Sequence, residues 1–364
     1  MSAPGIGYLL SANHYVAVSI AVLVPSLFAS APSRPSSVVS LAPMGLMLCY
    51  LLHAAILSSM TFGIVAGPRM FFELSIVLLV PLLAITRAIV RPEDIDLFVR
   101  ALLGASLLLG ALALVIALRQ WDFYKLHAPP IIMFADFRSG YLRVEGTANT
   151  HSLGFHLAFG ILLLEYVKAR GFGTAIVSLS WVQLLVLRLI LFGGLLMTDS
   201  RGALAGLVIG YFVYWVFLVD SRFLRAAFII VGAFSAVVAM VWLVTADFRY
   251  LGNLDSFSYR QELIRTAIAF ILSNPIFGNI NYLETGQFDH LVQGQGIVDI
   301  TNLYLLVGIQ FGLTGIVLFF GALAAPHVML IARPPRADRL SQSDMIAFRR
   351  LRAVVLGSGA GWFF

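Results

Sequence analysis

The chain has 364 residues, of which 60% are hydrophobic and only 12% are charged, and its mean hydropathy is +0.93. A soluble domain carries about twice that share of charged residues, and a soluble chain of this length would form about two or three domains with polar surfaces. The composition therefore excludes an ordinary soluble protein. It predicts one integral membrane domain over residues 1–364.

The net charge is +6, and 22 of the 24 basic residues are arginine. Most of these residues lie in short loops between apolar runs, a pattern that sets membrane topology rather than one that binds nucleic acid, so we expect no nucleic-acid partner. The only cysteine, Cys49, lies inside an apolar run. An intrachain disulfide and a cysteine-based metal site are excluded.

Apolar runs long enough to cross a bilayer, about 20 residues each, recur along most of the chain. They are 12–31, 39–62, 70–90, 97–118, 151–167, 173–197, 202–219, 223–245 and 302–332. A tenth begins near Leu351 and is too short to cross before Phe364, so we expect the chain to stop within a helix. The predicted fold class is all-α, a polytopic helical membrane protein with about ten transmembrane helices.

Two connections, 119–150 and 246–301, are long enough to build structure outside the bilayer. Counting the spans in order places most arginines of the short loops on one side, which the positive-inside rule makes cytoplasmic. Both long connections, the N-terminus and Arg201 then face outward. The segment 246–301 is the predicted large extracytoplasmic loop.

Within that loop, residues 258–273 are predicted to form an amphipathic helix at the membrane interface. Ser258 with Gln261 makes a capping box, and Asn274-Pro275 stops the helix. The apolar positions recur at helical spacing and are Tyr259, Leu263, Ile264, Ala267, Phe270 and Ile271.

The same helix carries Arg260 and Arg265, which are five positions and therefore about 140° apart around its axis. Both cannot point at one small target unless the helix lies across it. One arginine can bind a ligand while the other reaches lipid headgroups, or both can be merely interfacial.

Charged residues also lie close to or within the predicted hydrocarbon region. Asp199-Ser200-Arg201-Gly202 has almost no loop to hold it, so it either faces a cavity or forms a simple outer turn with an ion pair. Arg188 lies in the middle of an apolar run, as a functional residue or with a structural partner such as Glu165 or Glu73.

Histidines give no metal signature, because His151 and His156 are five positions apart and no His-Glu-x-x-His pattern occurs. His290 and Asp299 lie in the outer loop shortly before the span that opens at Asn302. Asp299 is near enough to the membrane surface to act as a base towards a lipid-linked substrate. Alternatively, Asp299 caps that helix together with Thr301.

A set of motifs then occurs in order around this loop. They are Thr198–Leu204 opening a span, Arg260 on the loop helix, Ser273–Gly278, Asp299–Leu305 with Gly308, Gly312, Gly315 and Phe319 following, and Arg143–Gly146 upstream. Over about 140–325 the chain resembles the O-antigen ligase and Wzy-type polysaccharide polymerase superfamily. Each motif alone is weak, and their order and placement make the set specific.

The resemblance implies a glycosyltransferase of the bacterial inner membrane with an extracytoplasmic active face. Its donor would be an undecaprenyl-pyrophosphate-linked glycan and its acceptor a glycan or lipid-linked glycan, with no metal and no other cofactor, and with polysaccharide export or chain-length proteins as possible partners. Arg201 and Arg260 would hold the pyrophosphate, with Arg143 as a third candidate and Arg265 as a further substrate-binding candidate.

One departure from the family pattern concerns the base. Ligases of the family usually place a histidine where this chain has Thr301, and threonine is a poor base at neutral pH. Asp299 becomes the preferred catalytic base and His290 the reserve. The change favours polymerisation of exopolysaccharide or capsule repeats over strict ligation to lipid A core. A second departure is Asn279-Ile280, which stands where a further glycine is expected.

Two other classes remain open. A transporter or flippase of lipid-linked oligosaccharide would also need many spans, yet it should show inverted repeats with interrupted helices in matching positions, and no such repeat is found. A non-catalytic assembly partner would keep the helical scaffold and lose the arginines of the motifs. Those arginines are present in this chain.

Overall fold

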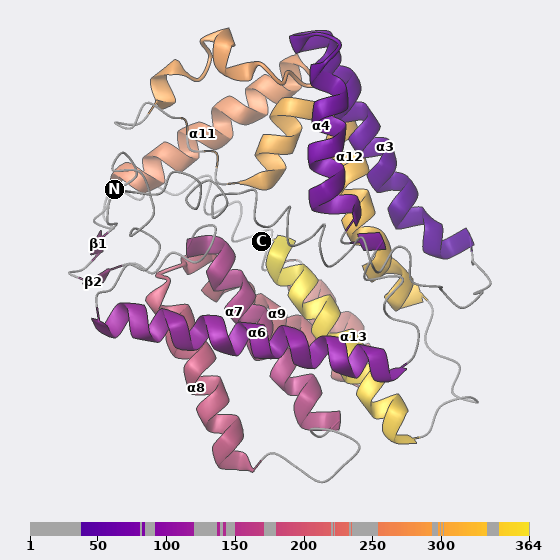
Figure 1. Cartoon of the computed structure of the whole chain (residues 1–364), viewed down its shortest axis with the longest axis vertical. Helices are drawn as coiled ribbons and strands as arrows, with labels where there is room; N and C mark the ends of the chain where they lie inside the picture. The colour runs from indigo at the N-terminus through magenta and orange to yellow at the C-terminus, as the bar shows by residue number, and fades with distance from the viewer. Residues whose placement is uncertain are drawn as a thin grey trace, which may run out of the picture. The chain divides into compact units, whose positions relative to one another are not determined.

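A computed structural model of the chain describes residues 38–80, 82–83, 92–119, 137–138, 141–142, 150–170, 180–219, 221, 223–232, 234, 254–292, 298, 300, 302–332 and 342–363. These residues are almost entirely helical, as predicted (Figure 1). They form two compact units. The first contains the described residues from 92 to 232 and from 330 to 363, and the second contains those from 38 to 83 and from 234 to 329.

The first unit is a helical bundle. Its elements are α6 (Pro92–Arg119), β1 (Phe137–Arg138), β2 (Tyr141–Leu142), α7 (Thr150–Arg170), α8 (Trp181–Met197), α9 (Arg201–Leu218), a helix over Phe223–Gly232, and α13 (Gln342–Phe363). The two short strands pair antiparallel within the predicted outer connection 119–150, with Phe137 opposite Leu142.

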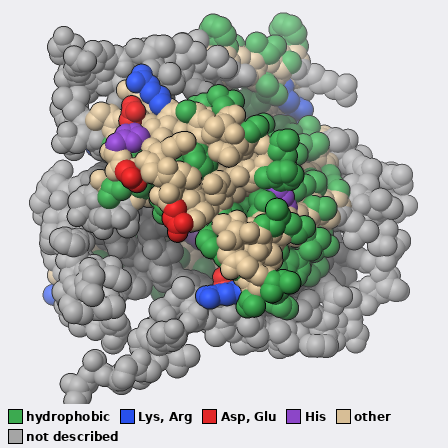
Figure 2. All heavy atoms as spheres, turned by 90° about the horizontal axis from the view of Figure 1, so that it is seen from above, with side chains coloured by type: hydrophobic (Ala, Val, Ile, Leu, Met, Phe, Trp, Pro, Cys, Tyr) green, Lys and Arg blue, Asp and Glu red, His purple; other side chains and the backbone are tan. Residues whose placement is uncertain are grey.

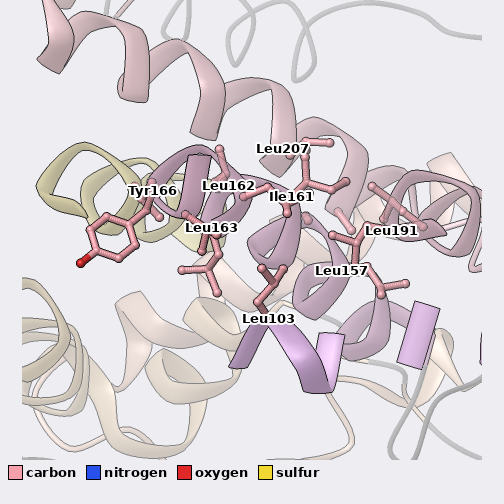
Figure 3. Packing of buried hydrophobic residues seen from close by; sticks show 14 of the residues in the cluster. Leu103, Leu157, Ile161, Leu162, Leu163, Tyr166, Leu191 and Leu207 are labelled. Carbon is pink, nitrogen blue, oxygen red and sulfur yellow. The ribbon is translucent and has the colours of Figure 1, made fainter. Parts of the chain in front are cut away.

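Helix α7 is the centre of this bundle and contacts α6, α8, α9 and α13. Most of its residues from Leu153 to Val167 are buried, which suits a helix enclosed by others. Figure 3 shows Leu157, Leu162 and Leu163 of α7 packed among Leu103, Leu191 and Leu207 of the surrounding helices, and all of these side chains are buried.

Glycines set the closest helix contacts of the bundle. A Cβ atom on Gly194 of α8 would lie 2.9 Å from the Cα of Gly110 of α6, and one on Gly357 of α13 would lie 2.4 Å from the carbonyl oxygen of Gly210 of α9. Small residues that let backbones approach are the usual means of helix association in a bilayer, where apolar burial gives little driving force.

The second unit contains α3 (Val38–Phe62), α4 (Ala66–Leu74), the π-helical turn η1 (Ser75–Leu79), α11 (Leu254–Ser273), the 3-10 turns η4 (Tyr282–Thr285) and η5 (Asp289–Leu291), and α12 (Leu303–Ala332). One apolar cluster joins α3 to α12, where Tyr50 packs against Phe311 and Phe319. Another joins α11 and the two 3-10 turns to Ile309 of α12.

Helix α12 is interrupted at Gly312, whose φ of 65° and ψ of −167° are not helical. The turn 275–279, which follows α11, supplies partners for the backbone groups around the break. The Leu313 N–H donates to the Pro275 carbonyl (2.8 Å), the Thr314 N–H donates to the Ile276 carbonyl (3.3 Å), and the Ile309 carbonyl accepts from the Asn279 N–H (2.8 Å). An interrupted helix is tolerated in a membrane protein because other parts of the chain satisfy its freed groups. We call residues 275–279 and 309–314 the α12 joint.

Replacing Gly312 by Ala should destabilise the protein by more than about 2 kcal/mol. A Cβ atom there would meet the Ile276 carbonyl oxygen at 2.4 Å, in a backbone conformation that side chains disfavour. Gly321→Ala in the same helix is the matched control, because its nearest neighbour, Leu46 Cδ1, is 3.6 Å away. Thermal unfolding of the purified variants should show a large loss only for Gly312→Ala, and equal melting temperatures would contradict this packing.

Four described helices are long and apolar enough to cross a membrane: Ala42–Phe62, Asp94–Arg119, Arg201–Leu218 and Leu303–Ile331. They match the predicted spans 39–62, 97–118, 202–219 and 302–332, whereas the predicted count of about ten is not confirmed. The predicted span 12–31 lies outside the described residues. The last helix begins at Gln342 and not near Leu351, because it includes a basic amphipathic stretch that the apolar count passed over.

Large apolar side chains on the described helices are exposed, which is expected where lipid replaces water. Leu118, Trp181 and Val208 have exposed fractions of 82%, 75% and 69%. Figure 2 shows broad apolar areas on one face of the described residues with few charged side chains among them. Such a surface would drive aggregation of a soluble protein and is ordinary in a bilayer.

Candidate active site

Arg201 is the first residue of α9 and follows a tightly bonded turn from α8. The Thr198 hydroxyl donates to the Leu195 carbonyl (2.7 Å) and accepts from the Ser200 N–H (3.3 Å). The Ser200 hydroxyl accepts from the Ala203 N–H (3.4 Å) and caps α9. Thr198 and Ser200 are completely buried. The turn is therefore fixed on both sides of Arg201.

The same turn holds a strained residue and an exposed guanidinium. Asp199 has a φ of 47°, a left-handed conformation that few residues other than glycine adopt and that asparagine and aspartate tolerate best. A Cβ atom on Gly154 of α7 would lie 2.8 to 3.1 Å from Ala203, Ser200 and Thr198, so α7 packs directly on the turn. Arg201 itself is exposed, at the positive end of the α9 dipole. This arrangement presents a cation on rigid support.

Arg188 has a structural partner, which is one of the two alternatives left open by its sequence. Its Nη2 lies 2.5 Å from Glu165 Oε1, and the Tyr211 hydroxyl donates to the same oxygen (3.2 Å). Glu73, the other suggested partner, pairs with Arg69 at 2.8 Å on an exposed surface of α4. Arg188, Glu165 and Tyr211 thus join α8, α7 and α9 inside the bundle.

Helix α11 confirms part of the prediction for 258–273 and corrects the rest. It ends at Ser273, as predicted from Asn274-Pro275, but it begins at Leu254. The predicted capping box at Ser258 is therefore wrong, because the helix starts one turn earlier and Ser258 lies within it. The buried face formed by Leu263, Ala267 and Phe270 packs against the chain's own η4, η5 and α12. That face is therefore covered by protein rather than by lipid.

Arg260 and Arg265 are both exposed on α11. From the helical repeat, Arg260 lies about 60° from the direction of Leu263, and Arg265 lies about 160° from it. Arg260 is therefore on the flank of the packed face, next to the neighbouring segments, whereas Arg265 points away from them. On this helix the two arginines therefore point in different directions.

His290 lies on the opposite flank of α11 from Arg260. Its Nε2 is 3.4 Å from the Thr266 hydroxyl and 3.8 Å from Glu262 Oε1, and about half of each charged side chain is exposed. Glu262 follows Arg260 by two positions, which is about 200° around the helix. Glu262 was not a predicted site residue, although its spacing of four from Thr266 places both on one helix face.

Asn302 is the cap of α12, since its Oδ1 accepts from the N–H groups of Tyr304 (2.9 Å) and Leu305 (3.1 Å). The capping role that was open for Asp299 is therefore filled by Asn302. Asp299 and Thr301 lie outside the described residues, as does Arg143. The neighbours of Asp299, Val298 and Ile300, pack against the α11 cluster, which ties this end of the loop to the helix.

Tyr282 of η4 is buried in the apolar cluster of the loop. Burial raises the pKa of the Tyr282 hydroxyl, with a smaller effect from Tyr259, so Tyr282 stays neutral and belongs to the apolar cluster. Within the described residues, no group of three or more His, Cys, Asp or Glu side chains could hold a metal ion.

Arg201 belongs to the first unit, and Arg260, Arg265 and His290 belong to the second. All four residues lie within the part of the sequence that matches a known family. Residues 185–320 match the family model described as O-antigen ligase, and this range includes Asp299 and excludes Arg143. No curated protein and no solved structure matches the chain. Residues 185–320, less than half of the chain, are therefore similar to the O-antigen ligase family.

Proposed function

We propose that the protein is a membrane glycosyltransferase that ligates or polymerises undecaprenyl-pyrophosphate-linked oligosaccharide units for a cell-surface polysaccharide. The observation that carries the proposal is the family match over 185–320, which itself suggests a membrane enzyme in polysaccharide assembly. The exposed Arg201, on its rigid turn within that range, adds a group suited to an anionic donor.

In this proposal Arg201 and Arg260 hold the donor pyrophosphate. The leaving pyrophosphate gathers negative charge as the glycosyl bond breaks, and guanidinium groups stabilise such charge with paired hydrogen bonds at low dielectric. Arg143 is a third candidate with less support, since it precedes the matched range. Arg265 points away from the packed face of α11 and is better placed for lipid headgroups or a distal part of the substrate.

Asp299 is the proposed general base and His290 the reserve. The acceptor hydroxyl oxygen attacks the anomeric carbon of the donor, its proton passes to the carboxylate, and the bond from that carbon to the pyrophosphate oxygen breaks. The electron pair leaves with undecaprenyl pyrophosphate. Asn302 already caps α12, so the carboxylate of Asp299 is not needed for that purpose. His290 lies beside Glu262, whose carboxylate can orient the imidazole ring. This contact places His290 on the flank of α11 opposite to Arg260.

We further propose that the loop 246–301 faces the extracytoplasmic side of the inner membrane, where the lipid-linked donor would be presented. Gln287 is exposed and suits a test of this topology. In a Cys49→Ser background, Gln287→Cys should react with a membrane-impermeant maleimide in intact spheroplasts. Labelling that occurs only after the membrane is opened would reverse the topology.

The interrupted helix α12 bears on the transporter alternative. Discontinuous helices of transporters present their free ends to a substrate or a coupling ion. Here the Ile309 carbonyl and the Leu313 and Thr314 N–H groups are all bonded to the turn 275–279. The break is therefore occupied by protein, which favours a structural joint over an ion or substrate site.

The enzymatic proposal is tested with the purified full chain in nanodiscs, supplied with undecaprenyl-pyrophosphate-linked repeat units. We expect release of undecaprenyl pyrophosphate in step with longer glycans. Movement of the intact lipid-linked unit between leaflets of a vesicle, without either product, would instead support a flippase.

A further inference from the structure

His53 of α3 contacts the α12 joint, although it lies far outside the residues that match the family. Its Nε2 is 3.1 Å from the Phe311 carbonyl oxygen, one residue before the break at Gly312. A carbonyl oxygen only accepts, so the His53 Nε2 carries a hydrogen and donates it. The His53 ring is also 5.9 Å from that of Phe277, in the turn that fills the break.

Three segments distant in sequence therefore meet at one point: α3, the turn after α11, and the interrupted α12. Both glycines of the joint have left-handed φ values of 65°. A Cβ atom on Gly278 would lie 2.5 Å from the Gly312 nitrogen, so the two backbones are in direct contact. With no side chains between them, the backbone hydrogen bonds and the His53 contact fix their separation.

The joint also ties α11, which bears Arg260, to α12, whose cap Asn302 follows Asp299 by three positions in the sequence. On one side, Asn274 closes α11, with its Nδ2 donating to the Phe270 carbonyl (3.3 Å) and its own carbonyl accepting from the Gly278 N–H (3.1 Å). On the other side, the first half of α12 runs from the cap at Asn302 to the break. A shift at the joint would change the direction of α11, with Arg260, relative to the start of α12 at Asn302, three residues after Asp299 in the sequence.

We propose that His53 is a positioning residue for glycan transfer, which donates a hydrogen bond to Phe311 and thereby locks the α12 joint that orients α11 against the mouth of α12. This role rests on the proposed function. His53 touches no reacting atom and acts through the backbone of Phe311.

The hydrogen bond, and not only the volume of the ring, is the essential feature of this role. A carbonyl that loses one of its donors in an apolar region has no water to replace that donor. Leucine would keep much of the packing against Phe277 and Phe311 without donating. Glutamine offers an N–H donor on a side chain of similar reach, so it should restore whatever depends on the hydrogen bond.

The test compares His53→Leu and His53→Gln in the full chain in nanodiscs, with Thr61→Val as the control on the same helix. The Thr61 hydroxyl donates to the Leu57 carbonyl of its own helix (2.9 Å), and Thr61 is exposed. Two readouts are measured: amide hydrogen exchange in peptides covering 275–280 and 311–316, and the kinetics of transfer from the lipid-linked donor.

For His53→Leu we expect exchange in both peptides to rise about tenfold or more, and kcat to fall about 10- to 100-fold while KM changes less than about threefold. His53→Gln should recover most of both losses, and Thr61→Val should show neither. Unchanged exchange and kcat in His53→Leu, or a His53→Gln variant as impaired as His53→Leu, would overturn the positioning role. If exchange rises while kcat is unchanged, the joint does not position the catalytic groups and the role is likewise overturned.

The two proposals fail in different ways. Absence of transfer by the wild-type protein counts against the glycosyltransferase and, with it, against positioning for transfer. The exchange measurement then still decides whether His53 locks the joint. Loss of transfer in Arg260→Ala with full transfer in His53→Leu would keep the proposed function and remove only the role of His53.

Discussion

Replacing Asp299 by asparagine should lower the rate of glycan transfer about 10²- to 10⁴-fold, the usual loss when a general base is removed. Asparagine keeps the shape and the hydrogen-bonding oxygen of the side chain but cannot take the acceptor's proton. The rate is followed by product length on a gel, with purified protein and lipid-linked repeat units. The melting temperature should stay within a few degrees of the wild-type value.

The variant Asn302→Ala is the matched control, because it removes a structural contact near Asp299 in the sequence without removing a proposed catalytic group. Because Asn302 caps α12, Asn302→Ala should cost about 1 kcal/mol of stability, seen as a lower melting temperature. Asp299→Asn should show the reverse pattern, with lost rate and retained stability. If Asp299→Asn transfers at the wild-type rate, Asp299 is not the general base and His290 takes that role in the proposal. Glu262→Gln should then slow the reaction, because Glu262 lies beside His290.

Arg201→Ala and Arg201→Lys should both reduce transfer by about 10²-fold or more, since the group they remove stabilises charge that develops in the transition state. Lysine is expected to fail because a point charge cannot reproduce the paired hydrogen bonds of a guanidinium. Arg201 is exposed and makes none of the bonds that close the Thr198–Ser200 turn, so both variants should insert and fold normally.

Arg69→Ala is a suitable control, since Arg69 is an exposed arginine whose partner, Glu73, is on the same helix. It should transfer at the wild-type rate. Full-length polymer made by Arg201→Ala at the wild-type rate would show that this arginine does not hold the donor. If Arg201→Lys retains activity, the reaction needs a positive charge at this position but not the paired hydrogen bonds of a planar guanidinium.

The spans that the sequence predicts best are those set by hydropathy alone. The runs 39–62, 97–118 and 202–219 each become a helix with nearly the predicted limits, because a bilayer demands about 20 apolar residues in helical form. The break in 302–332 was not predicted. That run is apolar throughout, and the left-handed Gly312 is stable only because the turn 275–279, distant in sequence, occupies the gap.

The polar residues likewise divide into features that the local sequence predicts and features that depend on packing between distant segments. The cost of an unpaired charge in a membrane predicts that Arg188 needs a partner, yet only the packing of α7 on α8 selects Glu165. Glu73 could have been set aside from the sequence, since Arg69 stands four residues before it on one helix. The contacts of His290 with Glu262 and of His53 with Phe311 depend on loop and helix packing, which no local pattern encodes.

The proposal that Arg201 and Arg260 hold one donor pyrophosphate is tested most directly by a density map of the full chain in a nanodisc with a non-transferable lipid-pyrophosphate analogue. We expect the pyrophosphate within hydrogen-bond distance of both guanidinium groups, at the membrane face that carries the loop 246–301, with the Asp299 carboxylate on the side of the sugar. Pyrophosphate density away from Arg201, or Arg201 and Arg260 on opposite faces of the membrane, would contradict the proposed site.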